Sequence, residues 1–326
     1  MNTVIFSVVI PLYNKVDSVS RTLASICEQR LTAAEIIVVD DGSTDGSADK
    51  VTALNIPNLI LVKQKNQGVS AARNYGVSLA QHQHVAFIDA DDQWSPFFLY
   101  EMSKLILRFP EHQCFASNYQ KVFEDGDYRN PKLAIGDVSP TGAVMINYFE
   151  VCAKGDLPFM PSSFVITTPL FKQLGGFPVG EAMGEDQSLF SQVFLQASLV
   201  YSPLVLMLYH TDSENRACDR NIPQDLLPFA ERLLEKVAAD EVDKAIAPFV
   251  LRYCAAHICH LAKINIQAGQ LSAAKQLLNH PVSKLKPLHR NLFGLWLISQ
   301  FLFSTTANLI RVTVNLPALI HFSKRQ

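Results

Sequence analysis

Three carboxylates crowd the stretch VAFIDADDQW, residues 85–94. They belong to Asp89, Asp91 and Asp92, and like charges so close repel unless a cation or hydrogen-bond donors stabilise them. Alternate side chains of an extended segment share a face, so Asp89 and Asp91 can address one ligand together. Divalent cations such as Mg²⁺ and Mn²⁺ bind one or two protein carboxylates plus phosphate oxygens. The stretch indicates a metal-bridged phosphate or, read alone, an acidic helix start stabilised by the helix dipole.

Strands that alternate with helices must position these carboxylates. The expected strands are VIFSVVIPLY (residues 4–13), the apolar start of AEIIVVDDGSTDGSADKVTALNI (34–56), NLILVKQ (58–64) and HVAFIDADD (84–92), and helical spacing follows the first three of them. This order predicts an α/β fold with a mostly parallel sheet and helices on both faces. Ligands of such sheets bind beyond the carboxyl ends of the strands. The polar loops PLYNK, DDGSTD, NQGVSAARN and DADD are therefore expected to meet at one edge.

A set of motifs carries a resemblance to a known family. FSVVIPLYNK, EIIVVDDGSTDGS, NQGVSAARNYG, VAFIDADDQW and GEDQSLF, in this order, resemble the motifs of the family 2 glycosyltransferases. These are inverting enzymes of the GT-A fold that use nucleotide-sugar donors. Each motif alone is weak, but the ordered set is specific and covers about residues 4–215. The resemblance implies a GT-A, Rossmann-like catalytic domain over residues 1–220, followed by an α-helical, basic C-terminal region over residues 221–326.

The resemblance also implies roles on the donor side. Pro11 and Tyr13 would line the nucleobase pocket, and Asp41 would accept a hydrogen bond from the base, which is uracil in the commonest case. Arg73 would contact the base or the phosphates.

The carboxylates after the fourth strand would bind the rest of the donor. Asp89 would bind the ribose, and Asp91 would hold the Mn²⁺ or Mg²⁺ ion that bridges the diphosphate, with Asp89 as a second candidate metal ligand. His210, which follows the apolar run VYSPLVLMLY, would be a further metal or diphosphate contact; the alternative is a surface hydrogen bonder. Asp92 receives no role.

GEDQSLF would supply the acceptor side of the reaction. Asp186 would be the general base that deprotonates the acceptor hydroxyl, and Glu185 beside it would help to fix the acceptor. A base on one face of the sugar and a metal-stabilised diphosphate on the other describe a one-step displacement with inversion.

Other functions fit the sequence less well. The turn PLYNK lacks the G-x-G-x-x-G of a dinucleotide fold, and the chain contains no P-loop. A sugar-1-phosphate nucleotidyltransferase shares the sheet architecture but normally opens with a G-x-G-x-R loop. A non-catalytic sugar-nucleotide sensor or scaffold is the third interpretation. The formal net charge of -2 gives no case for nucleic acid. The Q-x-x-R-W motif of processive polymerising members is absent, which favours addition of a single sugar.

The C-terminal region is basic and apolar. Residues 244–326 contain ten Lys or Arg and no Asp or Glu. The apolar stretch 292–303 is shorter than the roughly 20 residues that span a bilayer. Residues 285–326 therefore suggest peripheral contact with an anionic membrane, which would suit a lipid-linked acceptor such as a lipopolysaccharide or exopolysaccharide unit. The alternative is a helix that packs on the catalytic domain or on a homodimer partner.

Cysteine usage favours a reducing compartment. The six cysteines have no framework spacing, and the N-terminus lacks the features of a signal peptide. A cytoplasmic protein, at the inner face of the membrane if the tail binds there, is expected. Cys254, His257, Cys259 and His260 resemble zinc ligands, but side chains at this spacing on a helix cannot all point one way. They are predicted to serve helix packing.

Overall fold

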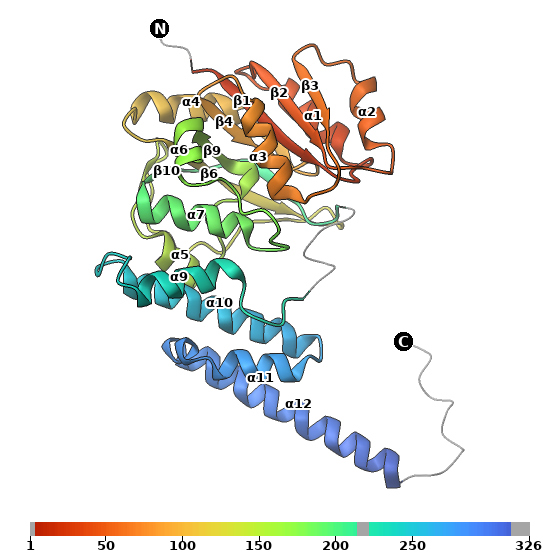
Figure 1. Ribbon diagram of the computed structural model, residues 1–326, viewed down its shortest axis with the longest axis vertical. Helices are drawn as coiled ribbons and strands as arrows, with labels where there is room; N and C mark the ends of the chain where they lie inside the picture. Colours follow the sequence, from red (N-terminus) through yellow and green to blue (C-terminus); the bar gives the residue numbers. More distant parts are fainter. Residues whose placement is uncertain (1–3, 214–221, 314–326) are drawn as a thin grey trace. The chain divides into compact units, whose positions relative to one another are not determined.

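The computed structural model describes residues 4–213 and 222–313 (Figure 1). The chain divides into two compact units. The first comprises residues 1–221 and 227–253, and the second comprises residues 222–226 and 254–326. The division predicted at residue 220 differs from this one because residues 227–253 group with the first unit.

A ten-stranded sheet forms the centre of the first unit. Its main path has the order β3-β2-β1-β4-β9-β6-β10-β5, with β7 beside β6 and β8 beside β10. The strands are β1 (Phe6–Leu12), β2 (Glu35–Asp40), β3 (Leu59–Lys63), β4 (His84–Phe87), β5 (Gln93–Trp94), β6 (Cys114–Val122), β7 (Tyr128–Arg129), β8 (Ala143–Met145), β9 (Phe164–Thr167) and β10 (Leu199–His210).

Helices cover this sheet. Those of the first unit are α1 (Val19–Cys27), α2 (Ser47–Ala53), α3 (Val69–Leu79), α4 (Phe98–Arg108), α5 (Tyr148–Lys154), the 3₁₀ turn η1 (Pro161–Ser163), α6 (Thr168–Gln173), α7 (Glu185–Gln196) and α9 (Pro228–Ala238). α3 packs on β1 and β2, whereas α4 packs on β6 and β10. Every residue of β1 and β2 is buried, as expected for strands covered on both faces.

Parallel pairing is confined to part of the sheet. β1 pairs in parallel with β2 and β4, and β2 pairs in parallel with β3, as predicted. β6 and β10 are also parallel. Between these groups β9 runs antiparallel to both β4 and β6. The sheet is therefore mixed, and the predicted strand–helix alternation applies to its first four strands.

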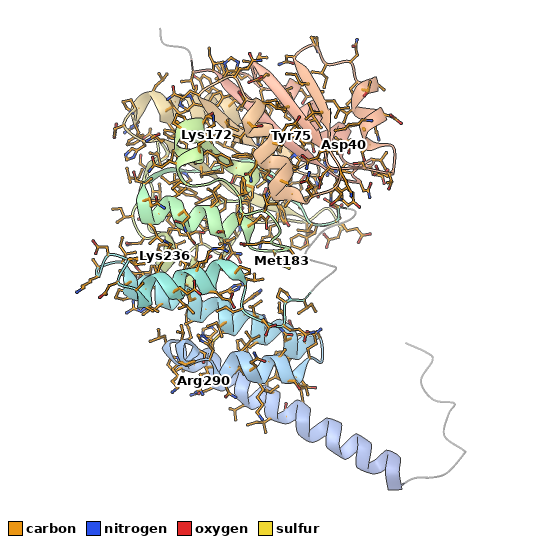
Figure 2. The ribbon with its side chains drawn as sticks, viewed as in Figure 1. Asp40, Tyr75, Lys172, Met183, Lys236 and Arg290 are labelled. Carbon is orange, nitrogen blue, oxygen red and sulfur yellow. The ribbon has the colours of Figure 1, made fainter. Side chains whose placement is uncertain are left out.

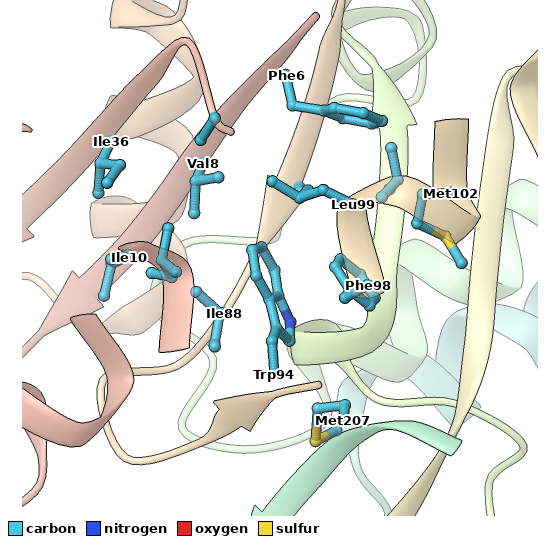
Figure 3. Close-up of a cluster of buried hydrophobic side chains, with 14 of the residues drawn as sticks. Phe6, Val8, Ile10, Ile36, Ile88, Trp94, Phe98, Leu99, Met102 and Met207 are labelled. Carbon is cyan, nitrogen blue, oxygen red and sulfur yellow. The ribbon is translucent and has the colours of Figure 1, made fainter. Parts of the chain in front are cut away.

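Trp94 lies in the main core of the first unit (Figure 3). Its ring stacks on Phe98 with the centroids 4.2 Å apart, and its surface is 1% exposed. The indole Nε1–H donates a hydrogen bond to the Ser162 carbonyl at 2.6 Å, so the one polar atom of this buried ring has a partner. This contact ties η1 to the segment that follows the DADD loop.

The second unit is helical. It contains the later part of α10 (Ala247–Gln267), α11 (Leu271–Asn279), the 3₁₀ turn η2 (Pro281–Leu285) and α12 (Pro287–Thr313). Gly269 separates α10 from α11 with φ +76°, a left-handed conformation that glycine adopts without strain. Ile258, Leu277 and Leu297 share its core. None of the described helices combines the length and the apolar character needed to cross a membrane.

Gly76 allows α3 to approach the sheet closely. A Cβ at this position would clash with Val9 Cγ1 and lie 3.3 Å from Val39 Cγ2. We expect Gly76→Ala to lower the free energy of unfolding by about 1–3 kcal/mol, because overpacking outweighs the gain in helix propensity. Urea unfolding followed by circular dichroism measures the change. Gly294→Ala on α12 is the matched control, since a Cβ there meets no atom within 4 Å; equal effects of the two substitutions would contradict close packing of α3.

Candidate active site

The loops at the carboxyl ends of β1 and β2 are joined by hydrogen bonds. The Asn14 N–H donates to Ser43 Oγ at 3.0 Å, and Asn14 Oδ1 accepts from the Thr44 N–H at 2.8 Å. Asn14 has φ +51°, a conformation that asparagine tolerates better than most residues. Asp40, the last residue of β2, is labelled in Figure 2 at this edge. The predicted meeting of the strand-end loops is therefore observed for β1 and β2.

Asp41 joins a third loop to this edge. Its carboxylate accepts hydrogen bonds from Gln64 Nε2 (2.7 Å), the Gln67 N–H (2.9 Å) and the Gly68 N–H (2.8 Å), all in the segment between β3 and α3. Asp41 is buried, as is Pro11 in β1, whereas Tyr13 just after β1 is 37% exposed. The three residues predicted to surround a base thus lie on strand ends that hydrogen bonds and strand pairing hold together.

Arg73 on α3 lies between two carboxylates. Its Nη2 is 2.7 Å from Asp89 Oδ1, and its Nη1 is 3.1 Å from Glu185 Oε1. The guanidinium also lies over the Phe177 ring, 4.9 Å from the centroid, and the residue is only 2% exposed. Asp89 and Glu185 raise the pKa of Arg73 despite its burial. The predicted donor-side and acceptor-side residues are therefore linked through one buried cation.

Asp91 pairs with a lysine from the loop after β1. Lys15 Nζ lies 2.7 Å from Asp91 Oδ2, and Arg21 Nη2 donates to the Asp91 carbonyl at 2.8 Å. Burial raises the pKa of Asp91, Lys15 opposes this shift, and Asp89 adds to it. The fourth strand-end loop is therefore attached to the first by a charge-assisted hydrogen bond.

Asp92 connects the loop that follows β4 to other elements of the fold. It is 1% exposed and accepts hydrogen bonds from Ser162 Oγ and from the His210 N–H, the latter at 3.3 Å. Thr22 Oγ1 donates to its carbonyl at 2.7 Å. Burial, followed by the charges of Asp91 and Asp89, raises the pKa of Asp92 well above its usual range. The carboxylate for which the sequence suggested no role thus connects the loop to η1 and to the end of β10.

His210 presents a buried ring nitrogen beside this loop. Within residues 4–213 and 222–313, Nε2 has no hydrogen-bond partner, while Nδ1 lies 3.9 Å from Asp212 Oδ1. Burial and then Arg21 lower the pKa of His210, so its imidazole is neutral near pH 7. A carboxylate near Nδ1 favours the proton on that atom, which leaves Nε2 as an acceptor or metal ligand.

The donor set fits a divalent cation that takes its remaining ligands from a bound diphosphate. In the part of the chain that the structure describes, no group of three or more His, Cys, Asp or Glu could hold a metal ion. Such an ion commonly needs only one or two protein carboxylates when phosphates complete its coordination. Asp91 is paired with Lys15 and Asp89 with Arg73, so either carboxylate would have to share an oxygen with the cation or exchange its partner. His210 Nε2 has no partner among the described residues and offers a further ligand atom.

Asp186 and Glu185 form the first turn of α7. Gly184 precedes them with φ +84°, and a Cβ there would come within 2.8 Å of Phe229 Cδ1, so a larger residue would displace the start of the helix. Asp186 Oδ1 accepts from the Gln187 N–H at 2.6 Å. Burial, helped by the neighbouring Glu185 charge, raises the pKa of Asp186 to about 7. A carboxyl with this pKa can accept a proton near neutral pH.

Sequence reasoning missed two residues of the site. Lys15 stood in the PLYNK loop, but its partner Asp91 lies 76 residues away in sequence. Ser162 donates to Asp92 and accepts from the Asp89 N–H at 3.0 Å. Nothing in the local sequence PSSF distinguishes this serine from a turn residue, so only the fold reveals it.

The zinc-like residues of α10 do not form such a site among the described residues. Cys254 and Cys259 are buried, while His260 is exposed. Burial lowers the pKa of His257 to about 3.

Comparison with known proteins identifies the first unit. Residues 7–161 match the family described as Glycosyl transferase family 2. The uncharacterized glycosyltransferase YibD of Escherichia coli K12 is 47% identical over 92 residues, which are 28% of this chain and 27% of YibD. The amylovoran biosynthesis glycosyltransferase AmsB of Erwinia amylovora is 33% identical over 152 residues, which are 44% of this chain and 48% of AmsB. The chain thus matches between about a quarter and a half of these relatives' length.

A solved structure matches over most of the chain. TarS 1-349 of S. aureus in complex with UDP-GlcNAc superposes with a TM-score of 0.64 and 18% sequence identity, covering 91% of this chain and 88% of that chain. At this identity the likeness shows the fold, a GT-A fold followed by helices. Together with the family match, it confirms the expected fold class. Residues 7–161 thus match glycosyl transferase family 2 over just under half of the chain, and the first unit has the GT-A fold.

Proposed function

We propose that this protein is a metal-dependent, inverting glycosyltransferase. It transfers one sugar from a nucleoside diphosphate donor, most simply a UDP-sugar, to a hydroxyl of a saccharide or lipid-linked acceptor in the synthesis of a cell-surface polysaccharide. The observation that carries this proposal is the Arg73 bridge. It connects Asp89, beside Asp91, to Glu185, beside Asp186, so one buried network contains carboxylates for the donor and for the base.

The donor site uses the strand-end loops. Tyr13 offers an exposed ring on which a base can stack, next to buried Pro11. Asp41 already accepts three hydrogen bonds, but an ionised carboxylate has about four acceptor sites, so one is left for a base N–H. Asp89 pairs with Arg73 through Oδ1, which leaves Oδ2 to accept a hydrogen bond from a ribose hydroxyl. Arg73 retains a buried Nε–H that has no partner among the described residues.

Asp91 and His210 would hold a Mn²⁺ or Mg²⁺ ion. When bound, such a cation neutralises developing charge on the leaving diphosphate. Lys15 places a positive charge beside the Asp91 carboxylate, so it contributes to binding of the anionic donor. Asp92 keeps the loop in place through Ser162 and the His210 backbone.

Asp186 takes the proton from the acceptor hydroxyl. Its pKa of about 7 makes the ionised form available at neutral pH while it remains a stronger base than an ordinary aspartate. The deprotonated oxygen attacks the anomeric carbon from the face opposite the diphosphate, and the configuration inverts. Glu185, held by Arg73, positions the acceptor.

The protein is proposed to act in the cytoplasm, at the inner face of the membrane. None of the five described cysteines, Cys27, Cys114, Cys152, Cys254 and Cys259, is in a disulfide, in keeping with a reducing compartment. AmsB is named for amylovoran biosynthesis, and TarS was crystallised with UDP-GlcNAc. These names support a UDP-sugar and a polysaccharide acceptor. Residues 314–326, part of the tail expected to contact the membrane, lie outside the described residues.

Loss of the Asp91 carboxylate tests the metal role. We expect Asp91→Asn to abolish the slow, Mn²⁺-dependent release of UDP from a panel of UDP-sugars, because the cation loses its main protein ligand. Released UDP is measured after a phosphatase converts it to inorganic phosphate, which malachite green detects. Asp137→Asn, at an exposed loop position, is the matched control and should keep wild-type rates. Tight donor binding with no turnover by the wild type, whatever acceptor is supplied, would instead indicate a sugar-nucleotide sensor.

The pH dependence tests the base. Asp186 acts only when ionised, so kcat/KM should fall about tenfold per pH unit below about 7 and level off above it. Asp186→Asn should lower kcat by about 10²–10⁴-fold and remove this limb of the profile. Initial rates over a pH series, with the metal kept saturating, provide the measurement. A variant that retains the wild-type profile would assign the base to another residue.

The same carboxyl should reduce the stability of the fold at neutral pH. Its folded-state pKa lies above that of the unfolded chain, so the native state binds the proton more tightly, and stability falls as the pH rises from about 4 to about 7. Asp186→Asn should therefore raise Tm at pH 8 but not at pH 4. Differential scanning fluorimetry at both pH values makes the comparison, and an equal shift at both would rule out ionisation as the cause.

A further inference from the structure

α12 carries apolar side chains on two opposite faces. Leu297 is buried on one face, where Phe293 and Trp296 also pack into the core of the second unit. On the other face lie Leu288, Leu292 and Leu295, which recur at the i, i+4, i+7 spacing of a helix. These three side chains, here called the outer face of α12, are 82%, 63% and 68% exposed. A row of exposed leucines on a helix whose other face is already packed indicates a site of contact with another apolar surface, such as a protein or a membrane.

The charge of the second unit selects the kind of partner. Residues 254–326 contain eight Lys or Arg and no Asp or Glu, and Asp225 is the single acidic residue of the segment 222–226. A second copy of this chain would bring two basic surfaces together across the outer face, and like charges disfavour that contact. An anionic surface, in contrast, is complementary to the positive charge of the second unit.

A groove beside the outer face adds a place for a phosphate. An open groove of about 560 Å³ between α11 and α12 is lined by Lys275, Arg290, Gly294 and Leu295 among others. Arg290, labelled in Figure 2, donates from Nε to the Leu278 carbonyl at 3.1 Å, which fixes its guanidinium at this groove. Gly294 leaves the wall open, since a Cβ there meets no atom within 4 Å. Lys275 and Arg290 can bind the phosphate of a lipid headgroup, and the neighbouring leucines of the outer face can contact its acyl chain.

We propose that the outer face of α12 docks on an anionic phospholipid bilayer, with a headgroup phosphate between Lys275 and Arg290. The leucines of the outer face enter the boundary between headgroups and acyl chains, and the charged ends of Lys275 and Arg290 remain among the phosphates. This docking deepens the proposed function, on which it rests for its purpose, because it would bring the first unit to lipid-linked acceptors. Its structural basis is separate, since every residue that carries it belongs to the second unit.

Vesicle flotation of the full chain tests the proposal. Wild type should bind phosphatidylcholine vesicles that contain phosphatidylglycerol, bind pure phosphatidylcholine weakly, and release as salt is raised. Leu288→Gln/Leu292→Gln should weaken binding by about tenfold or more, since apolar burial is lost. Lys275→Gln/Lys284→Gln removes two exposed lysines of the second unit, the first at the groove and the second in η2. It should weaken binding about fivefold per lysine, as a basic residue near an anionic surface contributes about 1 kcal/mol. The control Leu54→Gln/Leu107→Gln, at exposed leucines of the first unit, should bind as wild type does.

Three results would overturn the docking. They are equal vesicle binding by wild type and Leu288→Gln/Leu292→Gln, equal binding to neutral and anionic vesicles, and a wild-type dimer that the leucine variant converts to a monomer in light scattering. UDP release from a soluble donor, measured on the same samples, should be unchanged by the leucine and lysine substitutions. Vesicle binding without UDP release would therefore contradict the proposed transfer alone, and UDP release without vesicle binding would contradict the docking alone.

Discussion

A buried guanidinium holds the two halves of the site together. Arg73 is 2% exposed, and such a charge is tolerated inside a protein only when carboxylates or carbonyls compensate it. Its partners come from separate segments, Asp89 after β4 and Glu185 at the start of α7. Removing one partner of a buried pair typically costs about 3–5 kcal/mol, because the other charge stays buried. The loop after β4 and the first turn of α7 are thus constrained to one relative position.

The crowding of Asp89, Asp91 and Asp92 is resolved by giving each carboxylate a different environment. Asp89 pairs with the guanidinium of Arg73, and Asp91 pairs with the ammonium of Lys15. Asp92 accepts hydrogen bonds from the Ser162 hydroxyl and the His210 backbone N–H. An ammonium is a compact charge on a flexible stem, so Lys15 can be displaced from Asp91 more readily than the planar guanidinium can be displaced from Asp89. Under the proposed function, Asp91 is therefore the member of the three that would exchange its partner for the cation of a bound nucleoside diphosphate.

Sequence reasoning recovered what depends on local pattern. The apolar runs that became β1 to β4 are short, bounded by turn residues and separated by helical spacing, so both their type and their parallel pairing were predictable. Their order also predicts that the following loops share an edge. The strands after residue 95 were not all predictable, because β9 joins the sheet between β4 and β6, and only tertiary contacts decide its place. The pairing of Lys15 with Asp91 and the two bonds of Ser162 depend on the same distant contacts.

Asp186 shows why the surroundings of a residue, more than its type, decide its chemistry. At the first turn of α7 the helix dipole and the Gln187 N–H both favour the ionised form. Burial and the adjacent Glu185 oppose them and prevail, so its pKa rises to about 7. Arg73 moderates the rise, since its charge acts on Asp186 as well as on Glu185. The cation that fixes the geometry of the site therefore also lowers the pKa of Asp186 from the value that burial and Glu185 alone would give it.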